Sequence, residues 1–152
     1  MGLREQKLKE LGYADIETPQ PPGTLVWMDM VVIDGTTAYV SGHTSGDVRG
    51  KVPSKVDLAT AKKAAEWSMA NLLRTLRGHI GSLDRVERVL RLTGYVNTDL
   101  DFTDPSLVIH GASELLYTVF GDAGKHARTA LGLAQLPGGT TVEVEAIFKL
   151  KK

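Results

Sequence analysis

The chain of 152 residues has 42% hydrophobic and 24% charged residues, which is the composition of an ordinary globular protein of one domain. Its 18 Lys and Arg residues equal its 18 Asp and Glu residues, so no net charge favours nucleic acid or a membrane surface as partner. The absence of cysteine excludes a disulfide scaffold, a thiolate nucleophile and thiolate metal ligands. The N-terminal sequence lacks the apolar core of a signal peptide and no apolar run approaches a membrane span, so we expect a cytoplasmic protein.

The first part of the chain is predicted to be a helix followed by an extended arm. Residues 3–11 favour a short helix that ends at Gly12. The segment Glu17 to Thr24 contains three prolines and a glycine, which disfavour both a helix and a central strand. We therefore divide the chain into an N-terminal helix and arm, residues 1–24, and a single folded domain, residues 25–152.

A hairpin and a long helix are predicted next. Two apolar runs flank Asp34-Gly35, a dipeptide that indicates a tight turn between two strands. Ser54 and Asp57 are candidate N-caps of the helix, and Gly81 marks its end. Apolar residues recur between them at steps of three and four, as expected for a helix with one buried face. These residues are Ala61, Ala65, Met69, Leu72, Leu76 and Ile80.

The remaining elements are a strand, a second long helix and a final pair of strands. Residues 85–96 alternate as a strand does. The predicted apolar face of this strand carries Leu90, Leu92 and Val96. Asp104 followed by Pro105 indicates a helix start, because proline is favoured in the first turn, and this helix ends near Phe120. The last segment returns to strand and is interrupted by the turn sequence of residues 136–139.

The predicted order β-β-α-β-α-β-β indicates an α+β two-layer sandwich, in which two helices lie on one face of a mixed sheet. The last strand would have one apolar face, formed by alternate residues from Val142 to Leu150. Its other face would carry Glu143, Glu145, Ile147 and Lys149. No further helix is predicted to cover the second face of the sheet, so we expect another subunit to lie there.

Three stretches of the sequence resemble the RidA/YjgF family of enamine/imine deaminases. They are "YVSGH" after the hairpin, "HARTALGLAQLPGG" and "VEVEAIF", and their order and spacing carry the resemblance. The resemblance covers about residues 25–150, and it is strongest to a broad bacterial branch of the family. It implies a chorismate-mutase-like fold, a homotrimer, and active sites in the clefts between subunits.

The resemblance also implies roles for individual residues. The arginine of the family motif, here Arg128, binds the carboxylate of a 2-imino acid, a task suited to the planar guanidinium. Glu143, fifteen positions later, matches the glutamate that helps to place the attacking water. Ser41 matches a serine that lines the pocket. We interpret Glu145 as a solvated charge at the rim and His126 as supporting structure.

Three positions depart from the family pattern. Met28 stands where the family has a tyrosine, or Trp27 does if the register shifts by one. His43 replaces a glutamine, and His110 stands where asparagine is frequent. With a strand period of two, Ser41 and His43 would share a face, so His43 is expected to enter the pocket. The two histidines either replace the amides as hydrogen-bonding groups or carry protons. Met28, His43 and His110 are therefore candidate substrate-binding residues.

The leading functional hypothesis is hydrolysis of reactive 2-imino and 2-enamino acids to 2-keto acids and ammonia. Arg128 would hold the carboxylate while Glu143 orients a water molecule against the imine carbon, and we expect neither a metal nor a cofactor. Two alternatives stay open. One is a non-catalytic protein that binds small carboxylates, which the missing tyrosine favours. The other is a pathway-specific deaminase whose pocket uses His43 and His110.

Overall fold

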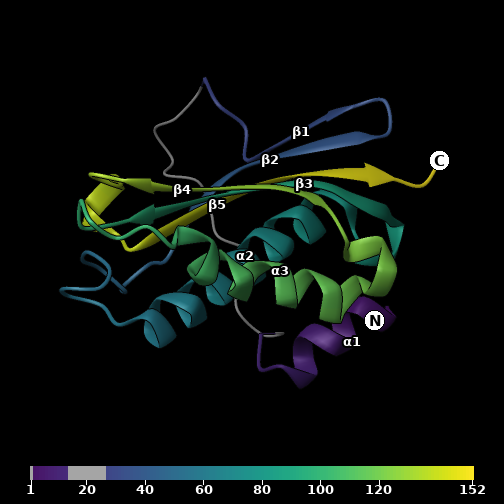
Figure 1. Ribbon diagram of the computed structural model, residues 1–152. Coiled ribbons are helices and arrows are strands. Elements are labelled where there is room, and N and C mark those ends of the chain that lie inside the picture. Colours follow the sequence, from purple (N-terminus) through teal and green to yellow (C-terminus); the bar gives the residue numbers. More distant parts are fainter. Residues whose placement is uncertain (1, 14–26) are drawn as a thin grey trace.

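The computed structural model of the protein describes residues 2–13 and 27–152. Within these residues, five strands form one mixed sheet in the order β1-β2-β5-β3-β4, and the helices all lie on one face of it (Figure 1). The elements are α1 (Leu3–Glu10), β1 (Val31–Asp34), β2 (Thr37–Thr44), α2 (Leu58–Ile80), β3 (Val86–Asn97), α3 (Pro105–Phe120), β4 (Ala127–Leu133) and β5 (Val142–Leu150). The predicted two-layer α+β sandwich and its order of elements are confirmed. The predicted arm, and the boundary between residues 24 and 25, lie outside the described residues.

Among the strands of the described residues, one pair of neighbours is parallel. β3 and β4 run parallel because the whole of α3 connects them, whereas β1–β2, β2–β5 and β3–β5 are antiparallel. The predicted turn at Asp34-Gly35 joins β1 to β2, and Gly35 has a φ of 59°, which glycine adopts without strain. β4 is an edge strand, so the residues on it border both the sheet and solvent.

The core lies between the sheet and the two long helices. All six apolar residues predicted for the buried face of α2 are buried, and Asp57 caps this helix by accepting a hydrogen bond from the Thr60 amide at 2.9 Å. The prediction that Leu90 lies on the same apolar face as Leu92 and Val96 is wrong. The pairing of β3 with β5 shifts between Val89 and Arg91, and this bulge buries Val89 and leaves Leu90 38% exposed.

The N-terminal helix is held against the connection between α2 and β3. Asp84 accepts a hydrogen bond from the Leu3 amide at 3.0 Å, and the Glu5 carboxylate accepts one from the Ser82 hydroxyl at 2.9 Å. The Arg4 guanidinium lies 4.7 Å from the centre of the Phe120 ring, a cation–π contact. These contacts fix the C-terminal end of α3, which borders the site described below.

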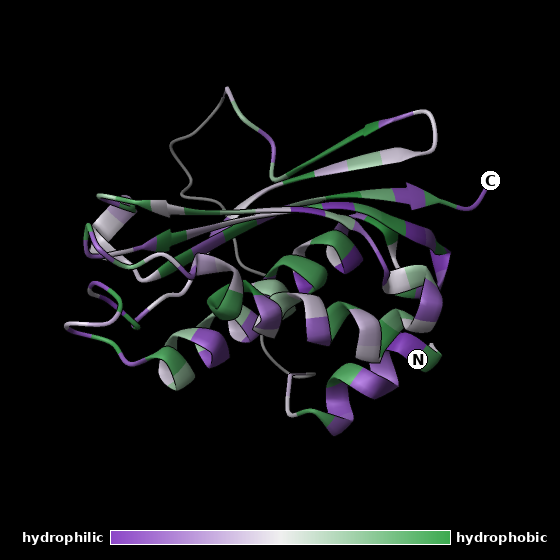
Figure 2. Cartoon of the chain, in the orientation of Figure 1, coloured by the Kyte–Doolittle hydropathy of each residue, from purple (hydrophilic) through white to green (hydrophobic). Residues whose placement is uncertain are grey.

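The face of the sheet opposite the helices carries both apolar and charged side chains. Val32 is 51% exposed and Tyr39 47% exposed, and the hydrophobic colour of β1 is visible along the upper edge of Figure 2. Cross-strand pairing places Tyr39 beside Ile147 on this open face. In the part of the chain that the structure describes, no helix is both long and apolar enough to cross a membrane.

Candidate functional site

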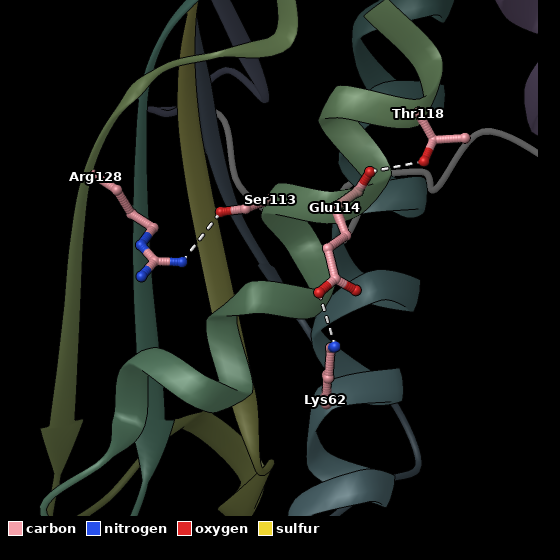
Figure 3. Close-up of polar contacts among 5 residues, drawn as sticks. All are labelled: Lys62, Ser113, Glu114, Thr118 and Arg128. Atoms are coloured by element: carbon pink, nitrogen blue, oxygen red, sulfur yellow. Dashed lines mark hydrogen bonds and ion pairs between the residues drawn. The ribbon is translucent and has the colours of Figure 1, made fainter. Parts of the chain in front are cut away.

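Arg128 lies on the helix side of the edge strand β4. It is paired with Leu92 of β3, which is buried beneath the helices, and paired residues on neighbouring strands point to the same face. One guanidinium nitrogen, Nη1, donates a hydrogen bond to the Ser113 hydroxyl of α3 at 3.2 Å (Figure 3). On the same helix Glu114 points away from Arg128 and pairs with Lys62 of α2 at 2.8 Å. The nearby carboxylate therefore belongs to another ion pair.

A directed chain of hydrogen bonds continues from Arg128. The Ser113 hydroxyl lies 3.1 Å from His126 Nε2, and His126 Nδ1 lies 2.6 Å from the Gly124 carbonyl oxygen. Because a carbonyl oxygen can only accept, Nδ1 carries the proton in the neutral ring, and Nε2 accepts from Ser113. Burial lowers the pKa of the His126 imidazole; the bond to Gly124 opposes this shift, and the positive charge of Arg128 adds to it.

A cavity of about 310 Å³ surrounds this chain of hydrogen bonds. Its lining residues are Ser113, Tyr117, Gly124, Lys125, His126 and Arg128. Two of these side chains are cationic and a third can become so, whereas none is acidic. Lys125 pairs with Asp122 at 2.6 Å near the surface, with its ammonium group 5.8 Å from the Tyr117 ring centre. This arrangement suits a small anion.

Glu143 lies on the opposite face of the sheet. It is paired with Thr44 of β2 and Tyr95 of β3, and its neighbours along β5 face the core. Burial raises the pKa of the Glu143 carboxyl, and the nearby charge of Glu145 acts in the same direction. A Cβ atom on Gly42 would lie 2.1 Å from Glu143 Oε1, so the carboxyl group occupies space that only glycine leaves open.

Ser41 lies on the same open face of the sheet as Glu143. Its hydroxyl donates to the Asp29 carbonyl at 2.9 Å and its amide to the Met30 carbonyl at 2.9 Å. A second cavity, of about 320 Å³, borders Ser41. Its polar lining includes Tyr39, Ser41, Arg91, Thr93 and Glu145. The structure thus places Ser41 and Glu143 on one face of the sheet and Arg128 on the other.

No family model matches this sequence. The protein TCP17 of Trypanosoma cruzi is 37% identical over 125 residues, which span 78% of each protein. The crystal structure of Atu1372 from Agrobacterium tumefaciens is 36% identical and covers 99% of this chain and 94% of its own, with a TM-score of 0.88. RidA from Psychrobacter sp. PAMC 21119 is 26% identical and covers 89% of this chain and 100% of its own, with a TM-score of 0.54. The chain thus resembles RidA proteins of known structure and shares their fold.

Of the departures from the RidA pattern, His43 lies in the core. Val40 of β2 pairs with Ala146 of β5, and His43 pairs with Val144. β2 therefore has one more residue than β5 between these two pairs. This bulge turns both Val40 and His43 towards the helices. His43 is 6% exposed, and its Nε2 lies 2.8 Å from the Thr75 hydroxyl of α2. The prediction that Ser41 and His43 share a face is wrong, and His43 lines neither cavity.

The other two departures lie apart from His43. His110 is partly buried on α3, one turn before Ser113, and Met28 is exposed next to Asp29. The described residues contain no group of three or more His, Asp or Glu side chains that is placed to hold a metal ion. Ser113 was not among the residues predicted for this RidA-family site. Its spacing of three from His110 and four from Tyr117 is the signal that places it on the same helix stripe.

Proposed function

We propose that this protein hydrolyses small 2-imino and 2-enamino acids to 2-keto acids and ammonia, at sites shared between the subunits of a homotrimer. The observation that carries the proposal is the cavity around Arg128, whose lining in the described part of the chain has basic side chains and no acidic one. Within residues 2–13 and 27–152, the Arg128 guanidinium makes one hydrogen bond, to the Ser113 hydroxyl. The remaining donors can therefore form a two-point contact with a carboxylate. The likeness to RidA proteins in sequence and fold supports the same reaction.

The separation of Arg128 from Glu143 supports the shared site. One chain presents the two side chains on opposite faces of its sheet, so they cannot both contact one small substrate. A complete site needs the Arg128 cavity of one copy and the Ser41–Glu143 face of another. The open face of the sheet, with its exposed Val32 and Tyr39, provides an apolar surface for such an assembly.

The reaction requires one water molecule and one proton relay. Arg128 holds the carboxylate and draws electron density from the imine carbon. Water attacks that carbon, its oxygen forms the new C–O bond, and the C=N double bond becomes a single bond. Glu143 accepts one proton from the attacking water and passes it to the nitrogen, which gives a neutral carbinolamine. It then accepts the remaining hydroxyl proton and passes it to the nitrogen as the C=O bond forms, the C–N bond breaks and ammonia leaves. A carboxyl group whose pKa is raised by burial suits both steps.

The test is a comparison of arginine variants. An amino-acid oxidase supplies the 2-imino acid, and the release of 2-keto acid is followed. Arg128→Ala is expected to lower kcat/KM by about a hundredfold or more, because a two-point charged contact contributes a few kcal/mol. Arg128→Lys should recover little, since an ammonium cannot present a planar fork. Arg88→Ala, at an exposed arginine of β3, is the matched control. An unchanged kcat/KM in folded Arg128→Ala would contradict the proposal.

A second function, the binding of small carboxylates without turnover, is favoured by Met28. This side chain has no hydroxyl group and lies exposed beside the strand that holds Ser41. Pyruvate that binds in an Arg128-dependent manner, with no acceleration of imine hydrolysis, would establish this function. The alternative of a pathway-specific deaminase is not supported by these two histidines, because His43 faces α2 and His110 lines neither of the two cavities.

A further inference from the structure

His126 and Ser113 lie directly behind the guanidinium that we have proposed as the carboxylate clamp. While the His126 imidazole is neutral, Arg128 donates to Ser113, Ser113 donates to His126, and His126 donates to the Gly124 carbonyl. The only proton of the Ser113 hydroxyl is therefore directed at the imidazole and is not available to a ligand. This follows from the donors and acceptors alone, since a hydroxyl has one proton and two lone pairs.

Protonation of His126 would reverse one bond in this chain. The imidazolium donates from both ring nitrogens, so Nε2 would then donate to the Ser113 oxygen. That oxygen can accept from Arg128 and His126 together, one bond to each lone pair. The hydroxyl proton is thereby released and can point into the cavity, where it would donate to a carboxylate held by Arg128. One added proton thus creates both a second cation and a second hydrogen-bond donor beside the ligand.

We propose that His126 and Ser113 are positioning residues of the clamp, and that an anion binds to Arg128 together with a proton on His126. This inference rests on the proposed role of Arg128 as the carboxylate-binding residue. It deepens that role by naming the state of the site that binds best. The ligand class is a small carboxylate of single negative charge.

The charged groups around His126 favour coupling between anion binding at Arg128 and protonation of His126. The titratable groups of α3 nearest Ser113 are His110, Glu114 and Tyr117. Asp122 and Lys125 follow in the connection to β4, and Lys62 of α2 contacts Glu114. Lys62 pairs with Glu114, and Lys125 pairs with Asp122, so four of these charges are compensated at the surface. Arg128 is the cation joined to His126 through Ser113, and its charge opposes protonation of the imidazole. A bound carboxylate compensates that charge, which raises the pKa of His126 in the complex.

Linkage gives the measurable consequence. If the anion raises the pKa of His126, protonated His126 must bind the anion more tightly by the same factor. Affinity is therefore expected to rise as pH falls from the pKa of His126 in the complex to its lower pKa in the free protein, with net uptake of up to one proton on binding between these values. One added charge-assisted hydrogen bond corresponds to about a tenfold gain in affinity.

The experiment uses pyruvate as the probe with the full chain. Calorimetric titrations at pH 5.5 and pH 8, in buffers of different ionisation enthalpy, give the dissociation constant and the number of protons taken up. NMR titration of the His126 imidazole, with and without pyruvate, measures its pKa directly. The wild type is expected to bind about tenfold more tightly at pH 5.5. His126→Gln should lose the proton uptake, and Ser113→Ala should lose most of the gain at low pH.

The two proposals fail in different ways. If Arg128→Ala binds pyruvate as well as the wild type, the clamp itself is wrong. If Arg128→Ala weakens binding but His126→Gln keeps the wild-type proton uptake, the clamp stands and the role of His126 is overturned. In that case Glu143 is the alternative source of the uptake, because burial also raises its pKa. A His126 imidazole pKa that pyruvate leaves unchanged would likewise overturn the inference.

Discussion

At the scale of single residues, His43 shows how burial makes a titratable side chain part of the folding equilibrium. Its two ring nitrogens lie 2.8 Å from the Ser41 carbonyl and 2.8 Å from the Thr75 hydroxyl. Burial lowers the pKa of the imidazole, against the effect of the hydrogen bond to Ser41, and the positive charge of Arg74 adds to the lowering. The folded protein therefore holds this ring neutral at a pH where an exposed imidazole already takes up a proton.

This difference predicts a loss of stability in mild acid. An imidazole of the unfolded chain titrates at about pH 6.5, so between that value and the lower folded-state pKa the unfolded state binds more protons. The contribution of His43 to the free energy of unfolding is complete above about pH 6.5 and is lost as pH falls through the folded-state pKa. Urea unfolding between pH 5 and 7 should show a smaller pH dependence in His43→Gln than in the wild type.

His126 acts in the same direction, because burial lowers its pKa as well. The double variant His43→Gln, His126→Gln is therefore expected to show a smaller slope than either single variant. A wild-type slope in His43→Gln would mean that the buried ring is protonated as readily in the folded protein as in the unfolded chain.

The residues of the candidate site differ in how far sequence could place them. The regular alternation of β5 correctly puts Glu143 and Glu145 on the face away from the core. The same rule fails for His43, because a bulge in the pairing of β2 with β5 shifts its face. Gly42, inside the bulged stretch, is the sequence signal for it, since a glycine within a strand often marks a bulge. Ser113 needed the fold itself, since only the packing of α3 beside β4 brings it to Arg128.

At the scale of elements, the two long helices cross where α3 has no side chain. A Cβ atom on Gly111 would lie 2.0 Å from the Lys62 carbonyl oxygen, which is part of the α2 backbone. A backbone oxygen cannot move aside as the end of a flexible side chain can. Gly111 therefore sets the closest approach of α2 and α3, and through it the position of Ser113 over the edge strand.

Gly111→Ala is predicted to destabilise the protein. Overpacking at such a contact costs about 1–3 kcal/mol, which exceeds the gain of about 1 kcal/mol from replacing glycine within a helix. Gly78→Ala is the matched control, because Gly78 is an exposed glycine of α2 and the same change should stabilise there. The measurement is the thermal unfolding midpoint at one protein concentration. An equal rise of the unfolding midpoint in both variants would contradict this prediction, because it would show that α2 and α3 can move apart without loss of stability.

Most elements could be predicted because each has a local chemical signal. Asp57 caps α2, proline begins α3, and glycines of positive φ form the turns at Gly35 and Gly138. The face of Leu90 could not be predicted, since the bulge at Val89 is a property of the pairing with β5.

At the scale of the whole molecule, the two halves of the proposed site lie on opposite sides of one sheet. The Arg128 cavity lies between the edge strand and α3, whereas Ser41 and Glu143 lie on the open face. The open face also exposes Val32, Tyr39 and Leu131, which are large apolar side chains. Assembly of several copies would cover these side chains and bring the two half-sites together, so activity and assembly are expected to be lost together.

The last prediction is that the protein is a homotrimer in solution. Light scattering should give a mass of about 49 kDa, three times the 16.4 kDa of one chain, as expected for a closed cyclic assembly. Tyr39→Lys places a charge on the open face and should shift the mass towards one subunit, because a buried unpaired charge opposes association. Leu3→Lys, at an exposed position of α1, is the matched control and should remain trimeric. A wild-type mass of one subunit would contradict both the assembly and a site shared between copies, since a single chain keeps Arg128 and Glu143 on opposite faces.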